Sequence, residues 1–152
     1  MTVVALRPAR PADSEFCFQL HKAAMGGYVT AIWGWDEQRQ RAYHDRSFDP
    51  GRWQIITAGG ADIGMIDVER RPTEIYLGRI EILPSHQGRG IGTGLITALI
   101  DEASRNGQDL TLDVLTVNSR AQALYERLGL TEVARHGDSD IKIRMRSGPP
   151  RR

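Results

Sequence analysis

Apolar residues in this chain recur with two periods, which predict strands in some stretches and helices in others. The clearest stretch begins with an apolar run over 75–83, which Pro84 stops because proline cannot donate to a strand ladder. Four glycines follow, and apolar residues then recur at helical spacing up to Ala103. Asn106 and Gly107 end that helix, since both tolerate left-handed backbone geometry. The stretch is therefore predicted to be a strand, a glycine-rich turn and a helix.

The same periods divide the remainder of the chain into further elements. Strands are predicted over 2–6, 53–58, 63–68, 109–117, 130–134 and 141–145. Helices are predicted to begin at 11–13 and end at the glycine pair 26–27, to begin at 36–37, and to run from 118 to 129. The turn at 59–62 predicts a hairpin. The resulting order is β-α-α-β-β-β-α-β-α-β-β, in which the three consecutive strands form an antiparallel meander.

Length and composition bound the class of protein. The 152 residues suggest one domain, predicted over 1–146, with a flexible tail at 147–152. A net charge of +1 gives no support for a nucleic-acid or membrane partner. One cysteine, no signal-peptide pattern and no membrane-length apolar run predict a cytoplasmic protein. That cysteine, Cys17, is interpreted as a small buried hydrophobe, and the four histidines lack metal-ligand spacing, so no metal is expected.

The glycine-rich turn has the chemistry of a pyrophosphate site. A helix amino terminus offers unpaired N–H groups, glycines let a phosphate approach the backbone, and Arg89 adds a cation. A P-loop is disfavoured because no lysine follows any of the glycines. A dinucleotide fingerprint is disfavoured because its last position is Thr93 or Leu95.

Two motifs carry a resemblance to a known family. Gln87-x-x-Gly90-x-Gly92 resembles the acetyl-CoA loop of the GNAT superfamily of N-acetyltransferases, and Asn118 with Tyr125 resembles that family's N-x(6)-Y-x-x-x-G segment. The order of elements over 3–145 is similar to the whole GNAT fold. The resemblance implies an α+β fold, with a mixed and mostly antiparallel central sheet flanked by helices.

The resemblance also implies a donor site for acetyl-CoA. Main-chain groups of Ile82 and Leu83 are expected to bind the pantetheine arm and to polarise the thioester. Asn118 is expected to hydrogen-bond the arm, and Tyr125 is expected to be the general acid for the departing sulfur. The implied cofactor-binding residues are Ile82, Leu83, Gln87, Gly88, Arg89, Gly90, Ile91, Gly92, Thr93, Asn118 and Tyr125.

The base and the acceptor site are less sharply marked. Glu81 precedes the loop on the same strand face as Arg79, so it is either the catalytic base or a salt-bridge partner. Its rivals are Asp67, Glu69 and Asp113. The candidate acceptor residues are Tyr28, Trp33, Trp35 and Glu81. The alternative is that the two tryptophans, together with Tyr43, pack in the core against a second helix.

These observations predict an acetyl-CoA-dependent N-acetyltransferase that acetylates a primary amine by direct attack in a ternary complex. The alternative is a non-catalytic module on the same fold that binds or senses acyl-CoA. Asp36, Glu37 and Glu81 favour a cationic small amine over an anionic acceptor, and a small amine is expected rather than a protein. Because family members are often dimers, the resemblance also implies a homodimer.

Overall fold

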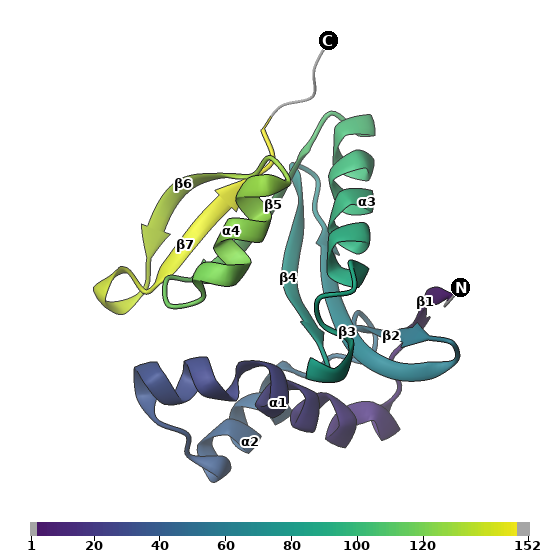
Figure 1. Ribbon diagram of the computed structural model, residues 1–152, viewed down its shortest axis with the longest axis vertical. Coiled ribbons are helices and arrows are strands. Elements are labelled where there is room, and N and C mark those ends of the chain that lie inside the picture. The colour runs from purple at the N-terminus through teal and green to yellow at the C-terminus, as the bar shows by residue number, and fades with distance from the viewer. Residues whose placement is uncertain (1–2, 149–152) are drawn as a thin grey trace. The chain divides into compact units, whose positions relative to one another are not determined.

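The elements of the computed structural model, which describes residues 3–148, follow the order that the hydrophobic pattern predicts (Figure 1). The strands in this part of the chain are β1 Val4–Pro8, β2 Gln54–Ala58, β3 Ala61–Arg70, β4 Glu74–Ile82, β5 Asp109–Leu115, β6 Thr131–His136 and β7 Lys142–Arg146. Its α-helices are α1 Ser14–Trp33, α2 Glu37–Ser47, α3 Ile91–Arg105 and α4 Ser119–Arg127. The predicted order is confirmed.

One sheet contains all seven of these strands, in the order β1-β2-β3-β4-β5-β7-β6. The pairs β1–β2, β2–β3, β5–β7 and β6–β7 are antiparallel. The pair β4–β5 is parallel, as expected for two strands joined through a helix. The predicted α+β fold, with a mixed and mostly antiparallel sheet flanked by helices, is therefore confirmed.

The described residues group into two compact units. The first unit is 3–67 with 79–89, and the second is 68–78 with 90–148. Strands β3 and β4 pass from one unit into the other. The prediction of one domain over 1–146 stays a prediction, and each unit is described by itself.

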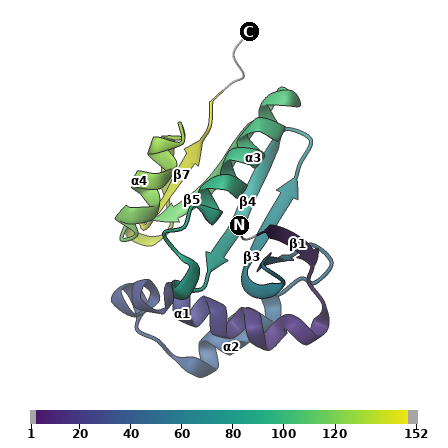
Figure 2. The same cartoon turned by 45° about the vertical axis from the view of Figure 1, so that its right-hand side comes forward.

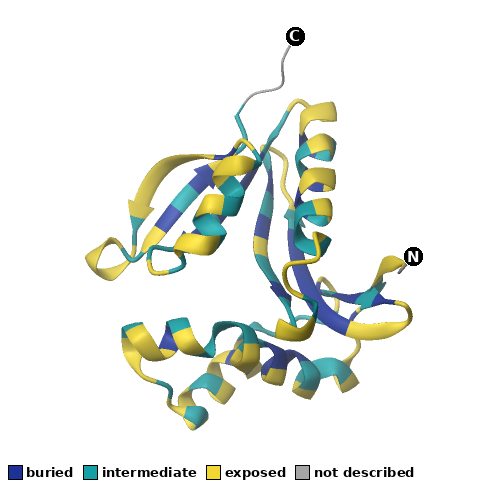
Figure 3. Cartoon of the chain, in the orientation of Figure 1, coloured by how far each residue is buried: buried dark blue, intermediate teal, exposed yellow. Residues whose placement is uncertain are grey.

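The first unit packs α1 against strands β2 and β3. Its core cluster consists of Ala9, Cys17, Leu20, Trp53, Ile55 and Met65, and Phe16, Phe48 and Leu83 pack against it. Strand β3 is dark blue over much of its length in Figure 3, because both faces of its central residues are buried. The predicted hairpin joins β2 to β3 through Gly59 and Gly60, both with positive φ.

Helix α1 is longer than the sequence predicts. Its predicted end at Gly26 and Gly27 is wrong, because the helix continues to Trp33. Glycine costs a helix only about 1 kcal/mol, and the extension buries Val29. The actual stop is Gly34, whose φ of +74° ends the helical geometry.

The second unit places α3 and α4 against β5, on one face of that strand (Figures 1 and 2). Helix α3 ends at Asn106 and Gly107, as predicted. The flexible tail predicted at 147–152 stays a prediction, and its first residue is hydrogen-bonded to β5. Ser147 N–H donates to the Leu110 carbonyl oxygen at 3.0 Å, and Leu110 N–H donates to Ser147 Oγ at 2.9 Å. Residues 149–152 lie outside the described part of the chain.

Gly64 on β3 lies so close to β4 that no side chain fits there. A Cβ atom at this position would collide with the Glu81 carbonyl oxygen, and it would lie 3.3 Å from Ile82 Cα and 3.2 Å from Ile56 Cδ1. We expect Gly64→Ala to lower the free energy of unfolding by about 1–3 kcal/mol, the usual cost of overpacking. Urea denaturation measures the change.

The matched control is Gly27→Ala on α1, where a Cβ would have no neighbour within 4 Å. This variant should raise the free energy of unfolding by about 0.5–1 kcal/mol, because alanine loses less backbone freedom in a helix. Equal effects of the two substitutions would contradict the close approach at Gly64.

Candidate active site

The site residues predicted from the sequence fall in both units. Those in the first unit are Tyr28, Trp33, Trp35, Glu81, Ile82, Leu83, Gln87, Gly88 and Arg89. Those in the second unit are Gly90, Ile91, Gly92, Thr93, Asn118 and Tyr125.

Gln87 joins the glycine-rich loop to the end of β4. Its Nε2 donates to the Ile82 carbonyl oxygen at 2.8 Å, and the loop from Gln87 to Gly90 is exposed. The Leu83 N–H donates to the Ile63 carbonyl oxygen at 2.8 Å. Successive residues of a strand direct their amides to alternate edges, so the Ile82 N–H points away from β3. Of the two predicted main-chain donors, Leu83 is engaged, and alternation along the strand directs the Ile82 N–H to the other edge.

The amino terminus of α3 has the features of an anion site. Gly90 precedes the helix with a φ of +80°, and its carbonyl oxygen accepts from the Gly94 N–H at 3.0 Å. A helix leaves the N–H groups before that point, here those of Ile91, Gly92 and Thr93, without intrahelical acceptors. The first turn has no acidic residue and no side-chain cap. This helix end therefore offers amide donors at the positive end of the helix dipole.

Asn118 and Tyr125 belong to α4. Asn118 Oδ1 accepts from the Ala121 N–H at 3.1 Å, so the predicted cap is found and this oxygen is engaged. Tyr125 is half-buried, and burial raises its pKa to about 12. Within residues 3–148 its hydroxyl has no hydrogen-bond partner.

Glu81 is buried beneath α1 and is paired with a histidine. Its Oε2 lies 2.5 Å from His21 Nδ1, and its Oε1 is buried without a hydrogen-bond partner among the described residues. The predicted alternative is a salt bridge of Glu81 with Arg79 or another cation. Arg79 is not the partner, because its guanidinium lies over the Trp53 ring at 5.2 Å from the ring centroid, and the partner found is His21. Sequence reasoning missed His21. The available signal was a polar residue one helical turn after the buried Cys17.

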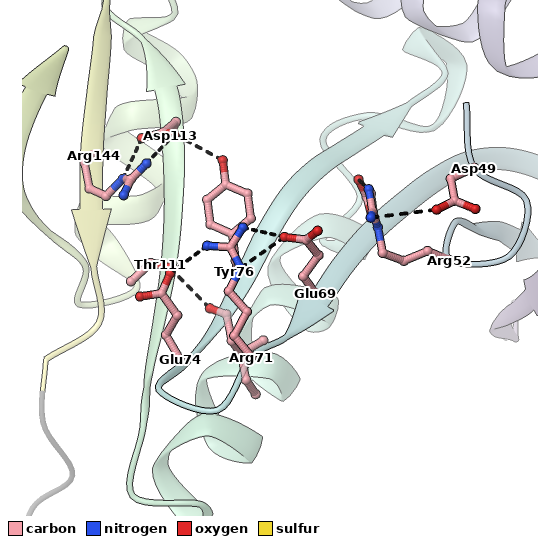
Figure 4. Close-up of polar contacts among 11 residues, drawn as sticks. Asp49, Arg52, Glu69, Arg71, Glu74, Tyr76, Thr111, Asp113 and Arg144 are labelled. Carbon is pink, nitrogen blue, oxygen red and sulfur yellow. Dashed lines mark hydrogen bonds and ion pairs between the residues drawn. The ribbon is translucent and has the colours of Figure 1, made fainter. Parts of the chain in front are cut away.

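Each of the three rival carboxylates is bound to an arginine, and Figure 4 shows this for Glu69 with Arg71 and for Asp113 with Arg144. Asp67 Oδ1 accepts from Arg52 Nε at 2.6 Å, and Glu69 pairs with Arg71. In each of these ion pairs the carboxylate oxygens accept from guanidinium N–H donors. Among the four candidate carboxylates, Glu81 is the one whose partner in the described chain is not an arginine.

Asp113 is held by three partners in the second unit. Arg144 donates to both carboxylate oxygens at 3.0 Å, Tyr76 donates at 3.1 Å, and His136 Nε2 lies 2.9 Å from Oδ1. Burial by itself raises the pKa of this carboxyl, but the hydrogen bonds and the Arg144 charge outweigh burial and lower the pKa to about 2. At neutral pH, Asp113 is therefore a structural anion.

The aromatic candidates for the acceptor site, Tyr28, Trp33 and Trp35, have different surroundings, as does Tyr43, which is not among those candidates. Trp35 packs between the helices, with its ring centroid 6.2 Å from that of Phe18 and its Nε1 donating to Glu37 at 3.0 Å. Trp33 is 56% exposed and Tyr43 is 49% exposed, so core packing is wrong for both. Tyr28 is partly buried on α1.

The acidic residues that favoured a cationic acceptor are engaged within the first unit. Asp36 accepts from the Arg39 N–H at 3.0 Å and caps α2, as predicted. Glu37 accepts from Lys22 Nζ at 2.8 Å. These two carboxylates therefore give no support for a cationic acceptor.

Cys17 is buried, and burial raises its pKa to about 12, so the thiol is inert as the sequence predicts. Over residues 3–148, no group of three His, Cys, Asp or Glu side chains is arranged to hold a metal ion. No helix in the same range has both the length and the apolar character of a membrane span.

A family model described as "Acetyltransferase (GNAT) family" matches residues 15–130. The chain therefore belongs to the GNAT acetyltransferase family. Its fold is also that of a PaiA N-acetyltransferase from Thermoplasma acidophilum, crystallised with coenzyme A. That match has a TM-score of 0.74 at 15% identity, over 95% of this chain and 98% of the other.

Curated relatives match in part. Mycothiol acetyltransferase of Beutenbergia cavernae is 33% identical over 98 residues, which are 62% of this chain and 33% of the relative. The ribosomal protein bS18-alanine N-acetyltransferase of Escherichia coli K12 is 42% identical over 60 residues, which are 39% of this chain and 40% of the relative. The matches thus span a third to two fifths of these relatives.

The Asp113 ion pairs make the second unit sensitive to acid. The folded pKa of about 2 lies below the ordinary value of ~3.9, so stabilisation by this carboxylate is complete above pH ~4 and is lost as the pH falls towards 2. We expect Asp113→Asn to remove roughly 2 kcal/mol of acid-dependent stability, measured by urea denaturation between pH 7 and 2. Asp101→Asn, at an exposed position on α3, is the control for losing one charge. A wild-type pH dependence in Asp113→Asn would contradict the assignment.

Proposed function

We propose that the chain is an acetyl-CoA-dependent N-acetyltransferase, in which a primary amine attacks the thioester directly within a ternary complex. The observation that carries this proposal is the loop after β4, where Gln87 is bonded to Ile82 next to the uncapped amino terminus of α3. Family membership supports the same activity, and both relatives described above are named acetyltransferases.

The donor would be held mainly by main-chain groups. Amides from Gln87 to Thr93 would bind the pyrophosphate, and Arg89 would add a charge-assisted contact. The Ile82 N–H, which points away from β3, would donate to the thioester oxygen as negative charge develops on it. Leu83 would contribute through its position in the strand, because its own N–H is engaged. The Asn118 side-chain amide nitrogen would bind the pantetheine arm.

Tyr125 would assist the leaving group by donating a hydrogen bond to its sulfur. With a pKa of about 12, complete transfer of its proton to a thiolate of pKa ~8.5 is uphill by roughly 5 kcal/mol. A hydrogen bond to the developing thiolate requires no such transfer and still stabilises the transition state. Glu81 would contribute to deprotonating the amine. Because its carboxylate is buried, it would act through its partner His21.

The acceptor would be a primary amine. The names of the relatives concern mycothiol and an alanine of a ribosomal protein, so both a small molecule and a protein are precedents. We propose a small amine. A homodimer and a cytoplasmic location stay predictions of the sequence.

Acetyl-CoA should stabilise the protein when NAD and ATP do not. At ~100 times its dissociation constant a ligand adds about 2.7 kcal/mol, which for a chain of this size is a rise in Tm of roughly 5–10 °C. A thermal-shift titration with the three nucleotides measures this. Stabilisation by NAD alone would contradict the proposed donor site.

Release of free thiol from acetyl-CoA, followed with a panel of amines, tests transfer. The panel comprises spermidine, kanamycin, free lysine and a peptide with an amino-terminal alanine. Acetylation of one of them would support the enzyme, whereas tight acetyl-CoA binding with no transfer to any would favour the acyl-CoA-sensing module.

Tyr125→Phe should lower kcat by roughly 10–1000-fold with the amine that the wild type acetylates, while binding of acetyl-CoA persists. The loss arises because phenylalanine cannot donate to the sulfur. Tyr43→Phe, at an exposed tyrosine of α2, is the matched control. Unchanged turnover in Tyr125→Phe would remove this residue from the mechanism.

A further inference from the structure

His21 and Glu81 form a buried pair whose two members differ in access to solvent. The Glu81 side chain is 4% exposed and that of His21 is 15% exposed. The 2.5 Å contact joins Glu81 Oε2 to His21 Nδ1. We assign the proton of this contact to Nδ1, which leaves Nε2 with a lone pair. No described residue hydrogen-bonds Nε2.

The titratable neighbours of the pair come from α1, α2 and β4. The Cys17 thiol on α1 is neutral, and Arg79 on β4 lies over Trp53. Burial lowers the pKa of His44 on α2, which keeps this neighbour neutral. The negative charge of Glu81 is thus the charge closest to the ring of His21. The unpartnered Glu81 Oε1 shows that the carboxylate is not held by another structural contact.

We propose that His21 is the catalytic base of the transferase and that Glu81 is its positioning residue. This inference rests on the proposed function and assigns a residue to the same site. A carboxylate with 4% exposure cannot contact an acceptor amine, whereas Nε2 of the more exposed His21 can. Glu81 immediately precedes Ile82, whose N–H is the proposed donor to the thioester oxygen, so the pair lies beside the reacting carbonyl.

The proton balance is complete. His21 Nε2 takes one proton from the acceptor ammonium, and Glu81 stabilises the resulting imidazolium through Nδ1–H. The neutral amine attacks the thioester carbonyl carbon, the new C–N bond forms and the C–S bond breaks. The thiolate of coenzyme A leaves with the bonding electron pair and is protonated by solvent. The amide nitrogen loses its second proton to water, and the imidazolium returns its proton to solvent.

Kinetics with spermidine and with the alanyl peptide test the assignment. His21→Gln should lower kcat/KM by about 10²–10⁴-fold and should abolish the acidic limb of its pH profile, in the range where imidazoles titrate. Glu81→Gln should lower kcat/KM and move that limb to lower pH, because an amide does not stabilise an imidazolium. The matched control is His136→Gln, which removes a histidine paired with Asp113 in the second unit and should leave the profile unchanged.

Two readouts separate failure of this inference from failure of the proposed function. A wild type that binds acetyl-CoA but acetylates none of the four amines of the panel overturns both. An active wild type with an unchanged His21→Gln profile overturns the role of His21 alone. Nitrogen-15 NMR of the wild-type imidazoles needs no variant. A proton on Nδ1 of His21 supports the assignment, and the Nε2–H tautomer overturns it.

Discussion

The register of β4 on β3 is the constraint on which the candidate site depends. Gly64 approaches the peptide between Glu81 and Ile82 so closely that no side chain fits there, and Leu83 is hydrogen-bonded to Ile63 beside it. A slip of one residue exchanges the faces of all side chains in a strand. In this register the Glu81 side chain points to α1. The Ile82 N–H points to the edge of β4 that faces away from β3. A backbone contact thus determines both which carboxylate is buried and which amide is available.

The sequence predicted the order of the elements because their periodicities and turn signals are local. Gly34, rather than Gly26 or Gly27, ends α1, since burial along a helix outweighs the small penalty of interior glycines. In the donor loop, the motif located Gln87 but not its bond to Ile82. That bond depends on a turn whose geometry is not encoded by spacing alone.

The base was only half predictable. Strand alternation placed Glu81 on the correct face, but its partner lies 60 positions away on α1. Long-range pairs of this kind arise from tertiary packing, which a single sequence does not reveal. The same limit applies to the rivals Asp67 and Asp113, whose arginine partners lie 15 and 31 positions away. Such pairing decides which carboxylates are engaged by guanidinium groups, as these two are, and which are not.

The proton transfers of the reaction explain why a histidine base would matter more for deprotonating the amine than an acid would for protonating the thiolate. At pH 7 an alkylamine of pKa ~10.4 must be deprotonated at a cost of roughly 5 kcal/mol, whereas an α-amino group of pKa ~7.8 requires about 1 kcal/mol. A departing thiolate of pKa ~8.5 takes a proton from neutral solution with a gain of about 2 kcal/mol. A hydrogen bond from the Tyr125 hydroxyl, whose pKa is raised, is thus sufficient to assist the departing sulfur. A base positioned by a buried carboxylate is most useful for a strongly basic amine. This argument favours an alkylamine over an α-amino group as the acceptor, and it does not depend on Asp36 or Glu37, which are engaged elsewhere.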